Sequence, residues 1–279
     1  MQVLSTVHEM RVACRNARQS GQSLGLVPTM GALHPGHISL VRAARAQCDV
    51  VAASIFVNPT QFGPNEDFAK YPRTFEQDCA LLEAEGVALV FAPTPEEMYP
   101  AGATTFIEVA EISDRLDGAS RPGHFRGVAT VVAKLFHIVA PDKAFFGQKD
   151  AAQVAILRRM VRDLNFDLDL VVCPIIREPD GLALSSRNRY LSAQERDLAL
   201  VLSRALHAIY ETWHAGQINV APLLDAAHSV MAIHPEVRID YLAIVDPDTL
   251  LPLDKAVPGA LAAIAAHVGT TRLIDNIIL

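Results

Sequence analysis

Two kinds of apolar pattern alternate along the first part of the chain. Short continuous apolar runs predict strands at residues 23–28, 49–57, 87–92, 143–146 and 169–176. Between them, apolar residues recur at helical spacing and predict helices at residues 38–47, 74–85, 125–139 and 150–164. Repeated strand–helix–strand units predict an α/β fold, a Rossmann-like and mainly parallel sheet with helices on both faces.

The pattern changes near residue 177. Ser192 and Glu195 form a capping box that opens a long helix to about His214, and a second helix is predicted at residues 221–233. Strand-like runs follow at residues 237–245, 260–267 and 271–278, with little room for crossover helices. We therefore expect two domains, a Rossmann-like domain over residues 1–176 and a smaller α+β domain over residues 177–279.

Parallel sheets bind ligands at the carboxyl ends of their strands. This rule brings together the loops at residues 29–37, 58–63 and 147–150. In the first loop, His34 and His37 flank a Pro-Gly turn that precedes a predicted helix. A helix N-terminus suits a phosphate, Gly36 lets the backbone approach a ligand closely, and imidazoles at this spacing can donate to phosphate oxygens. Two other interpretations stay open: a capping turn with incidental histidines, and a metal pair, although the third and fourth zinc ligands are missing.

Two further loops carry cationic groups. Lys149 lies at the end of a predicted strand, where the ligand crevice is expected, although it could also be an ordinary exposed lysine of a turn. Ser185 and Ser186 precede Arg187, and this set makes a compact phosphate clamp because Arg donates to two oxygens at once. An interdomain linker with solvated polar groups is the alternative. These loops contain neither a GxSxG motif nor a cysteine that would serve as a nucleophile.

Composition narrows the functional classes. Hydrophobic residues make up 51% of the chain and charged residues 20%, which predicts a buried core. A net charge of −7 disfavours a nucleic-acid partner. No apolar stretch approaches the roughly 18 residues of a membrane span, and residues 1–18 lack the apolar block of a signal peptide. The four cysteines are scattered, which predicts a cytoplasmic protein without disulfides.

Several segments together resemble the pantoate–beta-alanine ligase family, in the nucleotidyltransferase superfamily with HIGH-type histidine motifs. They run in family order from Pro28 to Leu191 and are PTMGALHPGH, FVNPTQFG, YPRT, RPGHFRGV, FFGQKD and DGLALSSRNRYL. The resemblance implies an ATP-dependent ligase of coenzyme A biosynthesis. Such an enzyme condenses (R)-pantoate with β-alanine through an enzyme-bound pantoyl adenylate, and its products are pantothenate, AMP and diphosphate.

The resemblance also implies roles for individual residues. The catalytic residues are expected to be His34, His37, Lys149, Ser185 and Arg187. The same residues are expected to bind ATP together with Met30, Gly147, Asp150, Ile176 and Ser186. Pantoate and β-alanine are expected to contact Met30, Asn58, Gln61 and Gln153. Asp78 is expected to hold Mg²⁺ on the triphosphate, directly or through water, whereas Arg121 and His124 are motif positions without an assigned role.

The expected partners are the small molecules ATP, pantoate and β-alanine, with no nucleic acid, no membrane and a second copy of the chain in a homodimer. The smaller domain is expected to close over ATP as a lid, with residues 185–187 at the hinge. Two other functions stay open. One is a different HxGH nucleotidyltransferase that acts on a phosphorylated acceptor, and the other is a sensor that binds ATP without turnover.

Overall fold

The larger sheet is parallel, as the alternating pattern predicts. The computed structural model describes residues 1–64 and 66–279. Within them, six strands pair in the order β1-β4-β3-β2-β5-β6. They are β1 (Gln2–Leu4), β2 (Leu24–Thr29), β3 (Val50–Ile55), β4 (Leu89–Phe91), β5 (Lys143–Gly147) and β6 (Asp169–Cys173). The strand order reverses at β2, which pairs with both β3 and β5, and such a switch point is where α/β sheets open a crevice. The predicted α/β class is confirmed.

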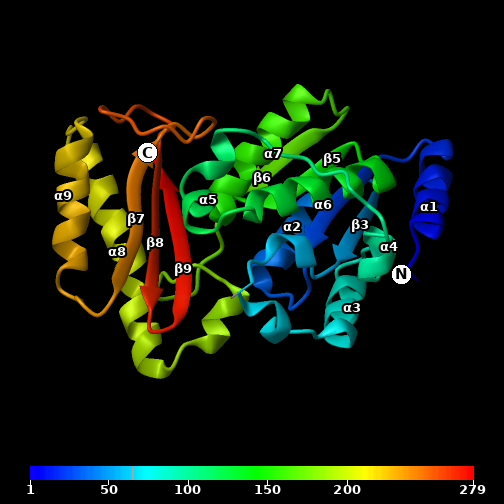
Figure 1. Cartoon of the computed structure of the whole chain (residues 1–279), viewed down its shortest axis with the longest axis horizontal. Coiled ribbons are helices and arrows are strands. Elements are labelled where there is room, and N and C mark those ends of the chain that lie inside the picture. The colour runs from blue at the N-terminus through cyan, green and yellow to red at the C-terminus, as the bar shows by residue number, and fades with distance from the viewer. Residues whose placement is uncertain (65) are drawn as a thin grey trace.

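Helices cover both faces of this sheet (Figure 1). The longer ones are α1 (Val7–Gln19), α2 (Pro35–Arg45), α3 (Phe75–Ala84), α6 (His124–Val139) and α7 (Ala151–Asp163). Short helices, α4 (Pro95–Met98) and α5 (Asp117–Ser120), lie in the connection before α6. Successive β3 residues enter different cores: Ala52 packs in the cluster with α1, α6 and α7, whereas Val51 and Ala53 pack in the cluster with α2 and α3. This alternation explains why β3 is apolar at almost every position.

The first helix has no counterpart among the predicted elements. Thr6 caps α1, and its side chain accepts from the Glu9 backbone while the Glu9 carboxylate accepts from the Thr6 backbone. The helix buries Met10, Cys14 and Ala17 at helical spacing against the sheet. Charged residues such as Glu9, Arg11 and Arg15 lie on its exposed side, so α1 is an amphipathic helix that the sequence analysis missed.

The second sheet is small and antiparallel, as expected for an α+β unit. It consists of β7 (Arg238–Val245), β8 (Leu261–Val268) and β9 (Thr271–Ile278) in that order. The helices α8 (Ala193–His214) and α9 (Val220–Met231) cover its outer face in Figure 1. The predicted capping box at Ser192 is present, because its hydroxyl accepts from the Glu195 backbone at 3.2 Å.

The inner face of the small sheet packs against the larger part of the molecule. Leu261 and Ala263 of β8 join the same apolar cluster as α6 and α7, whereas Ala262 and Ile264 point to α8 and α9. The boundary at residue 176 stays a prediction, since one apolar core continues across it. Among the described residues, no helix is long and apolar enough to cross a membrane.

Candidate active site

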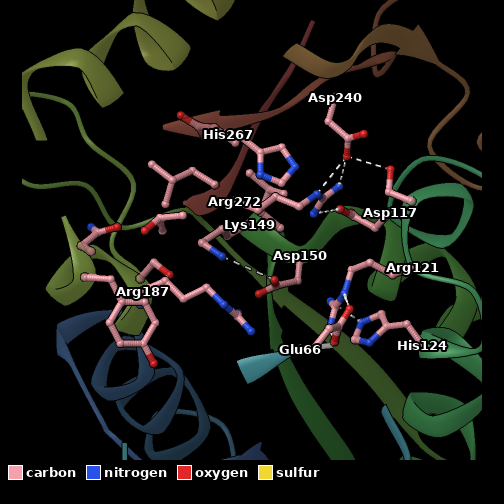
Figure 2. Close-up of a pocket in the computed structure, with 18 of the residues that line it drawn as sticks. Glu66, Asp117, Arg121, His124, Lys149, Asp150, Arg187, Asp240, His267 and Arg272 are labelled. Carbon is pink, nitrogen blue, oxygen red and sulfur yellow. Dashed lines mark hydrogen bonds and ion pairs between the residues drawn. The ribbon is translucent and has the colours of Figure 1, made fainter. Parts of the chain in front are cut away.

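A cavity of about 970 Å³ lies between the carboxyl edge of the large sheet and the small sheet. Its volume is at the upper end for small-molecule sites, so it has room for a nucleotide and a second ligand. Both parts of the chain supply its walls (Figure 2). Among the predicted site residues, those that line it are Lys149, Asp150, Gln153, Ser185 and Arg187.

Asp150 is the centre of a cationic cluster in this cavity. Lys149 Nζ lies 3.5 Å from Asp150 Oδ1, and Figure 2 shows Lys149 and Arg187 pointing toward the same space. Burial alone would raise the pKa of Asp150, but the charge and hydrogen bond of Lys149 and the charge of Arg187 hold it below its usual value. The structure therefore brings together cationic groups that come from separate predicted loops.

The two histidines cap α2 through their Nδ1 atoms. The Gly36 backbone N–H donates to His34 Nδ1 at 3.1 Å, and the His34 backbone N–H donates to His37 Nδ1 at 3.3 Å. A backbone N–H can only donate, so both Nδ1 atoms are unprotonated. A neutral ring then carries its hydrogen on Nε2, and each imidazole offers an N–H donor there.

Both rings are neutral at physiological pH. Burial lowers the pKa of His34 to about 4, and the charge of Lys149 adds to the effect. Burial likewise lowers the pKa of His37 to about 3, helped by the neighbouring His34, whose ring centroid is 4.1 Å away. The capping interpretation and the phosphate-donor interpretation are therefore compatible, because they use different nitrogens.

The metal interpretation of the histidine pair gains no support. Within residues 1–64 and 66–279, no group of three or more His, Cys, Asp or Glu side chains could hold a metal ion.

Gly36 was expected to let the backbone approach a ligand closely, and the structure shows a close contact of another kind. A Cβ at Gly36 would lie 2.8 Å from His34 Cε1, so the close approach that needs glycine is to the His34 ring.

Asp78 is buried and bonded to the loop before α2. Its side chain is 1% exposed, and its two oxygens accept from the backbone N–H groups of Ala32 at 2.9 Å and Leu33 at 2.8 Å. The Thr74 hydroxyl, just before α3, donates to the same carboxylate at 3.2 Å. These bonds engage Asp78 with the loop that leads to His34, so the carboxylate shapes that loop, and its Mg²⁺ role stays a prediction.

A cluster of neutral polar side chains contacts Met30 in the loop that carries the histidines. Gln61 Nε2 donates to Met30 Sδ at 3.1 Å, and Asn58 Nδ2 donates to Gln61 Oε1 at 3.1 Å. Asn58 is 1% exposed, and its Oδ1 accepts from Thr60 and Tyr99. Asn58 thus supports the Gln61 side chain, and its contact with substrate stays a prediction.

A chain of polar contacts links this cluster to the cavity wall. His124 Nδ1 lies 2.8 Å from the Gln61 carbonyl oxygen, and His124 Nε2 lies 3.1 Å from Arg121 Nη1. Arginine only donates, so Nε2 is the acceptor and Nδ1–H donates to Gln61. Arg121 is in turn held by both carboxylate oxygens of Glu66, at 2.7 and 2.6 Å. The structure thus shows that Arg121 and His124, whose roles the motif left open, support Gln61.

The other residues predicted to bind ATP lie near Lys149 or near residues 184–187. Gly147 ends β5 next to Lys149. Ser185 Oγ accepts from the Arg187 backbone at 3.2 Å at the start of the turn Ser186–Tyr190, and Ser186 is buried. The Ile176 carbonyl accepts from the Leu184 backbone at 3.0 Å, which places the segments at 176 and 184–187 side by side.

The small sheet adds residues that no motif indicated. Arg272 of β9 pairs with Asp117 of α5 at 2.7 Å and with Asp240 of β7 at 2.8 Å (Figure 2). Tyr241 donates to the other oxygen of Asp117 at 3.2 Å. These contacts join elements far apart in the sequence, so a local pattern could not reveal them.

Comparison with known proteins agrees with this geometry. The family model described as pantoate-beta-alanine ligase matches residues 2–278. A pantothenate synthetase of Acidobacterium capsulatum is 66% identical, over 100% of this chain and 97% of the relative. The crystal structure of pantothenate synthetase from Thermus thermophilus has a TM-score of 0.95 and 51% identity, with 99% of each chain covered.

A more distant structure was solved with ligands. It is pantoate-beta-alanine ligase from Francisella tularensis, complexed with beta-gamma ATP and beta-alanine. Its TM-score is 0.79 at 35% identity, and the match covers 100% of this chain and 97% of that one. The resemblance noted in the sequence is confirmed, and the chain belongs to the pantoate–beta-alanine ligase family, a family of ligase enzymes.

Proposed function

We propose that this enzyme condenses (R)-pantoate with β-alanine at the expense of ATP, through an enzyme-bound pantoyl adenylate. The observation that carries the proposal is that Lys149, Asp150 and Arg187 come together in the wall of one large cavity. The names of the relatives support the same substrates, and the Francisella tularensis protein was crystallised with an ATP species and β-alanine.

The first step is adenylation. A carboxylate oxygen of pantoate attacks the α-phosphorus of ATP, a new P–O bond forms, and the bond to diphosphate breaks. Negative charge grows on the phosphate oxygens, where the Nε2–H groups of His34 and His37 and the charges of Lys149 and Arg187 stabilise it. Neutral imidazoles suit this task because their donor hydrogens are already in place.

The second step is amide formation. The unprotonated amine of β-alanine attacks the acyl carbon of pantoyl adenylate, AMP leaves with the carboxyl oxygen that bridged to phosphorus, and the amine loses a proton. Gln61, supported by Met30 and Asn58, and Gln153 in the cavity wall are assigned to pantoate. No covalent bond to the protein is required, so most of the catalysis is positioning and charge stabilisation.

The family resemblance also indicates which residues contact the ribose and adenine of ATP. Gly147 and Asp150 follow β5 at the switch point of the sheet and are assigned to the ribose hydroxyls. Ser185, Ser186 and Ile176 form the opposite side, beside Arg187. Mg²⁺ stays a prediction of the family resemblance, and no step above depends on it.

The test measures products. In sustained turnover, AMP and diphosphate are expected in equal amounts, and this turnover requires pantoate and β-alanine together. ADP as a product, or continued turnover without β-alanine, would contradict the ligase. A different HxGH nucleotidyltransferase would instead leave the nucleotide on its final product, and an ATP sensor would give no turnover.

We also infer that the smaller domain closes over ATP, because residues 182–188 and 267–275 form one side of the cavity. Scattering should then show a more compact particle with ATP, whereas identical profiles would contradict closure. A homodimer and a cytoplasmic location are further predictions, to be checked by light scattering and cell fractionation.

A further inference from the structure

A side chain of the small sheet is bonded to the turn that carries Lys149. Asn276 lies in β9, and its Nδ2 is 3.0 Å from the Gln148 carbonyl oxygen and 2.9 Å from the Lys149 carbonyl oxygen. Gln148 Nε2 donates back to Asn276 Oδ1 at 3.1 Å. One buried amide, 3% exposed, thus makes three bonds to the turn Gln148–Asp150.

The chemistry of these groups fixes the orientation of the Asn276 amide. Carbonyl oxygens only accept, so the atom that faces the two backbone oxygens must be the amide nitrogen. Both of its hydrogens are then used, and the remaining oxygen faces the amide nitrogen of the Gln148 side chain. Each polar atom of the Asn276 side chain is satisfied, which is the condition for a buried polar group to be well ordered.

The position of Asn276 is itself firmly held. Its strand pairs with β8, where Asn276 lies opposite Ala263. The preceding residue, Asp275, is 4% exposed and accepts from both terminal nitrogens of Arg177, at 2.7 and 2.9 Å. A fork of this kind restricts both distance and angle. In Figure 1, β9 is the strand of the small sheet that faces the larger part of the molecule.

We propose that Asn276 is a positioning residue that holds the Lys149 backbone so that the Lys149 ammonium stays directed into the cavity. The inference rests on the proposed function, which assigns Lys149 to the ATP phosphates. Asn276 does not touch substrate and acts through the turn alone. The small sheet therefore supports the catalytic lysine even before any closure, in addition to forming a wall of the cavity.

The experiment compares four variants in steady-state kinetics. In Asn276→Ala the turn that carries Lys149 loses its support. Because a displacement of a reacting group by about 1 Å lowers a rate by about 100-fold, kcat should fall about 10- to 100-fold. KM for ATP should rise. KM for β-alanine should stay within about twofold. Gln148→Ala keeps both backbone bonds of Asn276 and should lose less activity. Ile277→Ala, the matched control, alters a neighbour that packs toward α8 and α9 and should lower Tm with its kinetics retained.

Asn276→Asp supplies a readout that a purely structural residue would not give. Its carboxylate would face two carbonyl oxygens and repel them, whereas a protonated carboxyl could donate to one. Its activity relative to the wild type should therefore rise as the pH is lowered. The proposal would be overturned if the activity of Asn276→Asp relative to the wild type did not change with pH and Asn276→Ala kept the kcat and the KM for ATP of the wild type.

Two further outcomes are informative. If Ile277→Ala, at an equal loss of Tm, loses as much activity as Asn276→Ala, the effect is one of stability and the proposal fails. If Asn276→Ala does not fold, Gln148→Ala and Asn276→Asp decide the question. If the proposed function is wrong, the wild type will form no AMP. The affinity of the wild type and the variants for a non-hydrolysable ATP analogue, measured by calorimetry, would then test whether Asn276 positions Lys149.

Discussion

Asp78 Oδ2 accepts from the Ala32 backbone N–H at 2.9 Å, at a point where the chain turns in an unusual way. Gly31 and Ala32 both have positive φ, 82° and 51°, and a Cβ at Gly31 would lie 3.0 Å from the same carboxylate oxygen. Left-handed backbone is unfavourable for alanine, so the Asp78 bonds stabilise a loop that would otherwise relax. That loop delivers His34 to the start of α2.

Replacement of Asp78 by Asn should therefore act through the loop. The amide in Asp78→Asn keeps the shape of the carboxylate but turns one acceptor into a donor that faces a backbone N–H. The free energy of unfolding should fall by roughly 2–4 kcal/mol, and activity should fall with it. Glu76→Gln, an exposed change on the same turn of α3, is the control. An unchanged Tm with a raised Mg²⁺ requirement would instead support a metal role.

His34 offers a way to separate capping from catalysis. Asn is a good helix cap, so His34→Asn should retain the bond from the Gly36 backbone and most of the stability. It lacks the Nε2 donor, and kcat should fall about 10²- to 10³-fold. His34→Ala loses both functions and should also lower Tm. Equal activity in the Asn variant and the wild type would remove His34 from the phosphate site.

The buried histidines predict a loss of stability in acid. His34, His37 and His124 have pKa values lowered by burial to about 4, 3 and 4, against about 6.5 in an unfolded chain. Below pH 6.5 the unfolded chain binds protons that the folded chain excludes. The free energy of unfolding should therefore fall as the pH falls, approaching about 1.4 kcal/mol per pH unit for each histidine.

Denaturant unfolding between pH 7 and pH 5 measures this slope. His124→Asn removes one of these groups and should make the slope shallower, while its amide can still donate to the Gln61 carbonyl. The same slope in the variant and the wild type would mean that His124 titrates normally in the folded protein.

Gly127 of α6 lies against the turn that carries Gln61. A Cβ at this position would lie 2.3 Å from the Thr60 carbonyl oxygen and 2.6 Å from the Gln61 backbone nitrogen. Gly127→Ala should push the turn away, lower stability by about 1–3 kcal/mol and raise KM for pantoate more than KM for ATP. Gly63→Ala is the control, since the nearest atom to its Cβ would be 3.6 Å away, an ordinary contact. A rise in both KM values to the same extent would contradict this local effect.

Local patterns in the sequence were sufficient for most of the fold. The strand predicted at residues 23–28 is Leu24–Thr29, and the helix expected from residue 150 is Ala151–Asp163. The helix after the first loop begins at Pro35 and not at residue 38, because a histidine acts as its cap and histidine is not among the usual capping residues. Apolar periodicity is a property of several residues within one helix or strand. It therefore predicts where an element lies better than where that element begins and ends.

The contacts within the candidate site were harder to predict from the sequence than the fold. The motifs indicated the loops that meet at Asp150, since a motif reports chemistry within a few residues. Glu66, Asp117 and Asn276 were missed because each acts on a group that is distant in the sequence. The backbone contacts of Asp78 were missed for a similar reason. An acidic residue in the first turn of a helix is compatible with several roles, and only the fold shows that it faces residues 32 and 33.

The bonds between Asn276 and the Lys149 turn also bear on how the protein acquires activity during refolding. They join positions 127 and 128 residues apart, and contacts of such long range form late, since a large loop must first be closed. The single tryptophan, Trp213, lies in α8 and reports on the small sheet and its helices. Catalytic activity should consequently return no earlier than the slowest fluorescence phase, even when most helical signal has already recovered.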